Sequence, residues 1–415
     1  MMKNCFFKIS VFLIILLFLE SCLIPVNANF LIEKKPISSL NFLKFNQNIT
    51  NLLKQYHVPG LSACIIKNDE VVWSKGYGYY NKLRFLKKPD GDTIYGTGCI
   101  TTTITATALL QLYEKGLFDL DDDVNNYLDF KLRNPDYPNK PINFTMLLTH
   151  QSSLSKFYTL NFFSVLKNFL GLIKKPYHLL DKVLVPGGKY YNPNVWLNNC
   201  PGENASYSAV GITILAYLVE LLSGQSFMNY CKENIFKPLN MTNSDFNAYN
   251  SNRKNLAVPY YPLKLTLKNK NFSFFIRIPR GRGYNAMIGS NGFVTTTNDL
   301  SHFLIAHMNG GVWNGNRILN ESTVKLMHKI HVYNVSDMES NYNLWGYGFG
   351  WLFYNDSGTI LQGHGGEDGW GSASSMICRD SDNIGVIMLF SAWSPEQYKV
   401  RGPLKQELFK IAERL

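Results

Sequence analysis

The sequence has only one long hydrophobic run, near its start, and no block in which basic residues alternate with aromatic ones. Of its 415 residues, 46% are hydrophobic and 17% are charged, which is ordinary for a globular chain with an ample core. The basic residues behind the formal net charge of +11 are dispersed along the chain. This pattern favours a generally basic surface over a nucleic-acid groove, so we expect no nucleic-acid partner.

The hydrophobic run covers residues 9–19 and follows two lysines. It is too short to span a membrane and has the length of the apolar part of a signal peptide. Small residues at 26 and 28 predict cleavage near residue 28. We therefore expect a signal peptide over 1–28 and a polar lead-in over 29–39. Lipidation of Cys22 is disfavoured because Glu20 lies inside its recognition motif. We expect a secreted protein with no membrane span after signal removal, and an uncleaved, membrane-tethering signal anchor is the alternative.

Cysteine is scarce, and five of the seven remain once the signal peptide is removed. An odd number in an oxidising compartment keeps at least one thiol outside any disulfide. Cys64 and Cys378 lie in strand-like segments, where they could pair or act as small buried residues. Cys200 with Cys231 is the other candidate bridge. Either pairing leaves Cys99 outside a disulfide.

Cys99 lies in a stretch, 95–112, whose character changes halfway. Its first four residues are typical of a tight, glycine-containing turn, whereas the later apolar residues recur at helical spacing. The change predicts a helix that begins close to Cys99. Backbone N–H groups converge at a helix N-terminus, and the positive end of the helix dipole favours a reactive thiolate there.

This stretch resembles the nucleophile helix of the beta-lactamase and penicillin-binding-protein superfamily, in particular its class C-like, beta-lactamase-related branch. The family pattern has an aromatic residue, a glycine, a Ser-x-x-Lys pair and an apolar run. Six residues match it without gaps, namely Tyr95, Gly98, Ile104, Thr105, Gln111 and Leu112. Cys99 falls on the serine and Thr102 on the lysine, so the resemblance implies that both reactive groups have changed.

Further motifs of the family occur in the same order along the chain. Residues 146–154 resemble its Leu-Leu-Thr-His-Thr-Ser-Gly-Leu turn, which implies a structural, hydrogen-bonding role for His150. Tyr207 matches the tyrosine of the second motif, Tyr-x-Asn, but Ala209 replaces the asparagine. His364 lies in the third motif, which is Lys-Thr-Gly or His-x-Gly in the family. The resemblance therefore retains a tyrosine and a histidine at the expected site.

Two later segments extend the resemblance towards the C-terminus. Residues 289–300 resemble the family's Gly-Gly-Leu-x-Ser-Thr-x-x-Asp-Leu segment, and 346–351 match its Gly-Tyr-Gly-Leu-Gly-Trp strand entry. In the first segment, Thr297 or Asn298 is expected to cap the helix that carries Leu300. The order of these motifs supports the fold that the resemblance implies.

That fold is of the α/β (α+β) class and of the beta-lactamase/transpeptidase type. It has an antiparallel sheet flanked by N- and C-terminal helices, with a large helical domain inserted between them. The resemblance covers about 40–412 and predicts one beta-lactamase-related domain over 40–415. Within it, we expect a sheet subdomain from about 40–95 and 340–415, and a mainly helical insertion at about 96–339.

The sequence pattern supplies elements for this sheet. Strands are predicted over 61–67, 71–80, 348–354, 359–363, 372–378 and 384–390, between a helix over 40–55 and a closing helix over 395–415. The apolar segment 157–184 is predicted to form helices that cap a substrate cleft. An amphipathic segment on a membrane surface is the alternative for this segment.

The expected site lacks the group that activates the family's nucleophile. Thr102 supplies no cation, and an unassisted tyrosine titrates near ~10, too high for a base at neutral pH. Losing a general base costs roughly 10²–10⁴ in rate. We therefore expect a catalytically degenerate protein that retains a ligand-binding cleft. The alternative is an esterase-, amidase- or peptidase-like acyl hydrolase. In that enzyme Cys99 would be the nucleophile and His364 or Tyr207 its partner. The backbone N–H groups of Cys99 and Glu367 would form the oxyanion hole.

The expected ligand is a small molecule or peptide with an ester or amide group. No metal or cofactor is expected, because His150 and His364 have no partners at metal-ligand spacing. Asn-x-Ser/Thr sequons after the signal fit a glycosylated extracellular protein. The candidate acceptors are Asn48, Asn143, Asn240, Asn271, Asn320, Asn334 and Asn355. A further sequon, at Asn204, is less suitable because Tyr207 close by should face the cleft.

Overall fold

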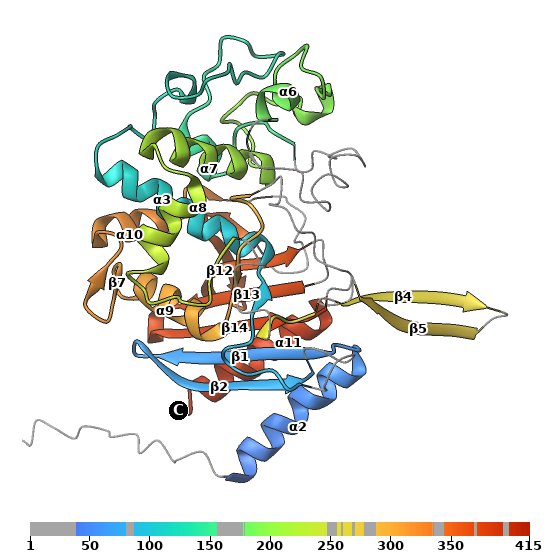
Figure 1. Ribbon diagram of the computed structural model, residues 1–415. Coiled ribbons are helices and arrows are strands. Elements are labelled where there is room, and N and C mark those ends of the chain that lie inside the picture. The colour runs from blue at the N-terminus through green and yellow to red at the C-terminus, as the bar shows by residue number, and fades with distance from the viewer. Residues whose placement is uncertain are drawn as a thin grey trace, which may run out of the picture.

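A computed structural model of the chain shows a large sheet covered by helices (Figure 1). The structure describes residues 39–79, 87–155, 177, 179–246, 255–258, 260–267, 270–277, 288–333, 335, 344–368, 372–392 and 398–415. The expected signal peptide, most of the 157–184 segment and Asn334 lie outside these residues. The predictions made for them therefore stay predictions.

The main sheet contains eight described strands in the order β2-β1-β14-β13-β12-β11-β10-β9, and every pair of neighbours is antiparallel. The strands are β1 Gly60–Lys67, β2 Glu70–Gly78, β9 Val332–Tyr333, β10 Leu344–Tyr347, β11 Leu352–Asp356, β12 Thr359–Asp368, β13 Ser372–Arg379 and β14 Ile384–Phe390. The N-terminal hairpin β1–β2 joins the C-terminal strands through the β1–β14 pair. Both ends of the chain therefore build one sheet, as predicted.

The central strands are buried on both faces, and successive residues supply two different cores. In β1, Cys64 and Ile66 belong to the larger core on the helical side, whereas Ala63 and Ile65 belong to a second core on the opposite face. Helices α2 (Ser39–Gln55) and α11 (Tyr398–Ala412) cover that second face. Helix α9 (Thr297–Met308) packs against β1 and β14 on the helical side.

Most of the described helices lie between the two parts of the sheet. The central one is α3 (Thr101–Glu114), which packs against α7 (Ala209–Ser223) and α8 (Phe227–Cys231). Besides α9, the described residues there also form α4 Phe144–Leu148, α6 Leu180–Leu184 and α10 Glu321–Met327. Short strand pairs also occur here, namely β3 Tyr95–Gly96 with β6 Val294–Thr295, and β7 Val312–Trp313 with β8 Asn316–Arg317.

Several local predictions need correction. A hairpin of β4 (Tyr260–Leu267) and β5 (Lys270–Arg277), which projects from the body in Figure 1, was not predicted. The strand predicted over 348–354 is interrupted, because the chain bends at Gly350, whose φ of +74° favours glycine. The cap of α9 is Thr296, whose side chain accepts from the Asp299 N–H, and not a later residue.

The structure also tests the predicted disulfide bridges. Cys64, Cys200, Cys231 and Cys378 are thiols, so neither candidate bridge forms. Cys64, Cys231 and Cys378 are buried, which fits the other expectation, that of small core residues. Within the described ranges, no single helix is long and apolar enough to cross a membrane, and one bent pair, Ala209–Ser223 with Phe227–Phe236, meets that test by length and composition alone.

Candidate functional site

Cys99 lies in a 3₁₀ turn, Gly98–Ile100, that leads directly into α3. Gly98 has a φ of +57°, a conformation that glycine adopts at little cost. The Thr101 hydroxyl donates to the Gly98 carbonyl over 2.6 Å, and the Thr103 hydroxyl donates to the Ile100 carbonyl over 2.8 Å. Cys99 itself is half-buried. The helix start near Cys99 that the sequence predicts is therefore present, and its buried threonines hold the turn.

Strand β12 lies directly against this turn. A Cβ atom added to Gly366 would lie 1.9 Å from the Thr97 carbonyl oxygen and 2.7 Å from the Cys99 nitrogen. A Cβ added to Gly98 would lie 2.4 Å from the Glu367 nitrogen. Two glycines facing each other thus let the two backbones touch. An oxyanion hole formed by the N–H groups of Cys99 and Glu367 needs this close approach.

Two side chains from outside the family motifs hold β12 and the start of the turn. Arg401, on α11, donates to the Gly366 carbonyl over 3.2 Å and pairs with Glu367 over 3.3 Å, so it joins α11 to β12. Ser374, on β13, donates to the Thr97 carbonyl, just before the turn, over 2.5 Å. Sequence reasoning missed both residues. Only the fold brings them to these positions, since Arg401 lies in the closing helix and has the pattern of an ordinary surface arginine.

Tyr207 lies just before α7, and its described contacts include one hydroxyl and two imidazole rings. Its hydroxyl is 3.4 Å from the Thr102 hydroxyl on α3, so the position of the expected base and the tyrosine meet as the resemblance implies. Its ring centroid lies 4.4 Å from that of His150 and 6.1 Å from that of His364. Ala209, the first residue of α7, is half-buried and offers no amide.

His150 is held as a hydrogen-bond acceptor. Its Nδ1 atom accepts from the backbone N–H of Ser208 over 3.2 Å, and its backbone carbonyl accepts from the N–H of Ser206 over 2.8 Å. Burial, with a smaller contribution from His364, lowers the pKa of His150 to about 3. The imidazole is therefore neutral at pH 7 and fixes the chain that carries Tyr207, in keeping with the structural role expected from the sequence.

His364 lies inside β12, because the strand runs to Asp368 rather than ending at 363 as predicted. The side chain is only 2% exposed, and its Nδ1 donates to the Gly365 carbonyl over 2.6 Å. The lone pair is then on Nε2, which has no hydrogen-bond partner among the described residues. Burial lowers the pKa of His364 to about 4, so the ring is a neutral, buried acceptor at pH 7.

The structure thus brings Thr102, Tyr207, His150 and His364 together through measured contacts, with Cys99 less than one turn before Thr102. It places the Glu367 backbone against the turn that carries Cys99. In the part of the chain that the structure describes, no group of three or more His, Cys, Asp or Glu side chains is arranged to hold a metal ion. The arrangement suits a ligand with a carbonyl oxygen.

Comparison with known proteins shows the family. The sequence model of the Beta-lactamase family matches residues 45–408, which is most of the chain. The chain belongs to the Beta-lactamase family. As a member of this family, it has the mixed α/β fold with a large antiparallel sheet that the motifs predicted. The residues that the resemblance assigns to changed positions of the Ser-x-x-Lys and Tyr-x-Asn motifs, Cys99, Thr102 and Ala209, lie within the matched region.

This chain is similar to individual relatives over part of their length. It is 31% identical over 214 residues to the PbpX protein of Bacillus subtilis (strain 168), which covers 51% of this chain and 48% of that protein. It is 25% identical over 338 residues to the flp protein of Staphylococcus aureus (strain N315), covering 81% of this chain and 60% of that protein. The chain therefore spans about half to three-fifths of the length of these relatives.

Solved structures confirm the fold. The octameric penicillin-binding protein homologue from Pyrococcus abyssi has a TM-score of 0.70 at 24% identity, over 88% of this chain and 77% of that one. The D-amino acid amidase from Ochrobactrum anthropi SV3, complexed with L-phenylalanine, has a TM-score of 0.67 at 18% identity, over 89% and 99%. At these identities the likeness extends to the fold alone.

Proposed function

We propose that this member of the Beta-lactamase family binds a small peptide, ester or amide ligand at the Cys99–Tyr207–His364 site without efficient turnover. The observation that carries the proposal is the contact between Thr102 and Tyr207. Where the family pattern has a lysine, a neutral hydroxyl lies 3.4 Å from the tyrosine oxygen. A hydroxyl neither accepts the nucleophile's proton at neutral pH nor stabilises a phenolate by charge.

The two histidines whose rings lie beside Tyr207 do not replace the missing cation. His150 and His364, whose pKa values are lowered by burial to about 3 and about 4, are both neutral at pH 7. The loss of general-base catalysis corresponds to roughly 10²–10⁴ in rate, which supports slow or absent acyl transfer.

The features that bind a carbonyl group are retained. Gly98 and Gly366 keep the backbones of the Cys99 turn and of β12 in contact. Arg401 bonds to β12, and Ser374 bonds to the Thr97 carbonyl just before the turn. Oxyanion holes need only preorganised backbone donors, so a ligand carbonyl can be held without a catalytic side chain. Cys99 and Tyr207 are only half-buried and so are open to a ligand.

An acyl hydrolase that uses Cys99 is the second candidate, because the His364 Nε2 lone pair is buried and has no partner among the described residues. Burial lowers the pKa of the His364 imidazole to about 4, which makes it a weak base for a thiol. The low basicity of His364 favours the binding function over the hydrolase.

Intact-mass spectrometry after exposure to ester, β-lactam and thiol-directed probes tests the choice. The wild type is expected to form no acyl adduct that subsequently decays, and Cys99→Ala serves as the background control. An adduct on Cys99 that forms and then hydrolyses would falsify the binding proposal and establish the hydrolase.

A pair of matched variants tests whether the Thr102 position explains the loss of turnover. Cys99→Ser/Thr102→Lys restores the reactive pair of the family pattern, whereas Cys99→Ser/Thr102→Met has a side chain of similar length without the amine. We expect an acyl adduct only in the lysine variant. Equal reactivity of the two variants would show that the missing amine is not what limits the site. Circular dichroism of both variants establishes that the buried substitution is tolerated.

Secretion and glycosylation are part of the same proposal. Asn48, Asn240 and Asn320 are exposed, as an acceptor must be, whereas Asn143 is half-buried and its side-chain oxygen accepts from the Met146 N–H as the cap of α4. We therefore expect the three exposed sites to carry glycan more fully than Asn143. The shift in mass after enzymatic deglycosylation of protein secreted from a eukaryotic host, mapped by peptide, checks this order.

A further inference from the structure

A cavity far from Cys99 lies between the end of α2 and the outer edge of the sheet. Its volume is about 600 Å³, and it is lined by α2, by the end of β2 and by Lys88. In the order of the sheet, β2 is separated from β12 by β1, β14 and β13. With a spacing of about 4.8 Å between strands, the two sites are on the order of 19 Å apart. The cavity is therefore separate from the proposed acyl-binding site.

The inner wall of this cavity is apolar and aromatic. Leu53, Val58 and Pro59 are buried, as is Tyr77, and Tyr79 is half-buried. A volume of this size falls within the range of about 300–1,000 Å³ that small-molecule sites occupy. The wall can therefore cover the apolar part of a small organic molecule.

The lining carries positive charge without compensation. Lys54, Lys75 and Lys88 are exposed at the cavity, His57 lies beside them, and no carboxylate is among the described residues that line it. Like charges gathered at one opening raise the local potential and attract an anion. The lining thus combines an apolar interior with cationic groups, which is the complement of a molecule with an apolar body and an anionic group.

The side chain of Lys75 is held by contacts within the protein. Its ammonium group donates to the Asn46 side-chain oxygen over 2.9 Å and lies 5.5 Å from the centre of the Tyr77 ring. The Tyr77 hydroxyl donates to the same oxygen over 2.5 Å. A lysine ammonium has three N–H donors, so two remain for a ligand. Holding this cation in place before binding reduces the entropy that a ligand contact costs.

The C-terminus of α2 repels an anion only weakly. A helix C-terminus acts as about half a negative charge, but the last carbonyls of α2 already accept hydrogen bonds from the backbone. Those of Leu52, Leu53 and Lys54 accept from the N–H groups of the three residues at 56–58. Three full positive charges outweigh this partial negative charge.

We propose that this cavity binds a small, soluble organic anion, a phosphate or carboxylate with an apolar group attached. The anionic group contacts Lys54, Lys75 and Lys88, and the apolar group packs against Val58, Pro59 and the tyrosines. The site does not depend on the proposed acyl-binding function, because no residue is shared between them.

Calorimetric titration of the full chain with phenyl phosphate tests the proposal, with neutral benzyl alcohol as the matched probe. We expect saturable binding of phenyl phosphate with a Kd of about 0.1–1 mM, typical of a small ligand held by few contacts, and much weaker binding of benzyl alcohol. Raising the salt concentration should weaken phenyl phosphate binding, because exposed charges are screened. Absence of saturable binding of phenyl phosphate in this range refutes the proposal.

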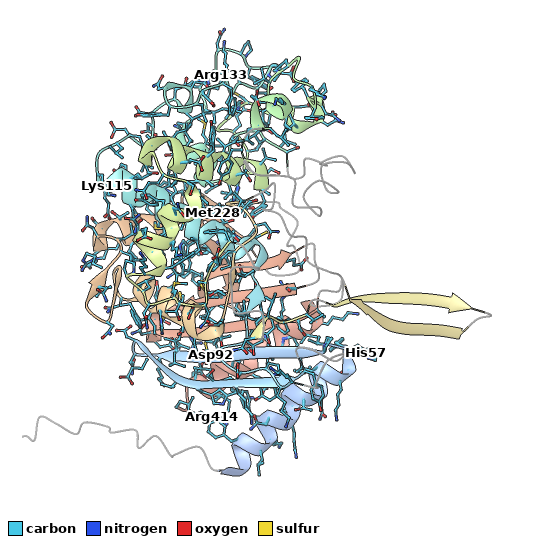
Figure 2. All side chains as sticks on the ribbon, viewed as in Figure 1. His57, Asp92, Lys115, Arg133, Met228 and Arg414 are labelled. Atoms are coloured by element: carbon cyan, nitrogen blue, oxygen red, sulfur yellow. The ribbon has the colours of Figure 1, made fainter. Side chains whose placement is uncertain are left out.

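Two charge-matched variants show where the anion binds. Lys54→Gln/Lys88→Gln removes two charges at the cavity. Lys131→Gln/Lys140→Gln removes two exposed charges that flank Arg133 in the sequence, and Figure 2 shows Arg133 far from His57. Only the first variant should raise the Kd, by about tenfold. An equal effect of both variants refutes the site, because it would reflect net charge alone. Cys99→Ala should bind as the wild type does.

Vesicles of phosphatidylglycerol distinguish a free anion from a membrane. Co-sedimentation of the wild type with the vesicles, lost in Lys54→Gln/Lys88→Gln and combined with no binding of phenyl phosphate, would replace the proposal with a lipid-surface site. Binding of phenyl phosphate without co-sedimentation supports it.

Discussion

Acidification should unfold this protein because buried histidines are neutral in the fold. Burial lowers the pKa of His150 to about 3 and that of His364 to about 4, and both side chains are almost fully buried. In the unfolded chain a histidine has a pKa of about 6.5. Because the folded-state pKa is the lower one, the stability that each histidine contributes is present above pH 6.5 and is lost as the pH falls towards 4.

The magnitude follows from these pKa values. Between pH 7 and pH 5, each of the two histidines lowers the free energy of unfolding by about 2 kcal/mol, or by about 4 kcal/mol together. Asp299 acts in the opposite direction, because burial raises its folded-state pKa to about 6. Its protonation in the fold therefore raises the free energy of unfolding by about 1 kcal/mol over the same pH range. The net loss is about 3 kcal/mol. His307 and His328, whose pKa values burial also lowers, add to the loss.

Urea unfolding at pH 7 and pH 5, followed by tryptophan fluorescence, measures this difference in the free energy of unfolding. His364→Gln should reduce the pH-dependent loss by about 2 kcal/mol, whatever it does to stability at pH 7. Lys131→Gln, an exposed substitution, is the control for a change of charge alone. The reasoning is refuted if the wild type is equally stable at both pH values, or if His364→Gln shows the same loss as the wild type.

Two further substitutions test the packing that builds the site. Gly366→Ala should destabilise the protein by about 3 kcal/mol in chemical unfolding, because its Cβ would meet the Thr97 carbonyl. Gly365→Ala, whose Cβ would have no neighbour closer than 3.6 Å, should cost far less, and equal costs would contradict the close contact. Ser208→Ala should cost about 1 kcal/mol in thermal unfolding, because the hydroxyl caps α7 by accepting from the Gly211 N–H over 3.1 Å. Ser208→Thr, which retains a hydroxyl, should be milder, and a full loss in that variant would argue against the cap.

The sequence predicted the parts of the fold that depend on local pattern. The helix α2, the β1–β2 hairpin and strands β13 and β14 lie within a few residues of the predicted ranges. These elements are predicted directly by the local sequence, because alternating side chains and apolar runs indicate strands and helices. Motif order was sufficient for the family, since it is written in the chain itself.

Local pattern failed where a distant part of the chain decides the conformation. The 348–354 strand is broken at Gly350, where a Cβ would lie 2.5 Å from the Cβ of Ala106 on α3. β12 continues past 363 because β13 pairs with it as far as Asp368. Neither the packing of α3 nor this register is visible in the residues of the strands themselves.

For the candidate site, the sequence determined which side chains are available, and the motif resemblance predicts from Cys99, Thr102 and Ala209 which reactive groups are replaced. Only the tertiary structure decided how they meet. The Thr102–Tyr207 contact joins residues 105 positions apart, the burial of His364 makes it neutral, and Arg401 reaches Gly366 from the closing helix. Distances and burial depend on contacts between remote segments, and these arise only when the whole sheet and its helices have packed.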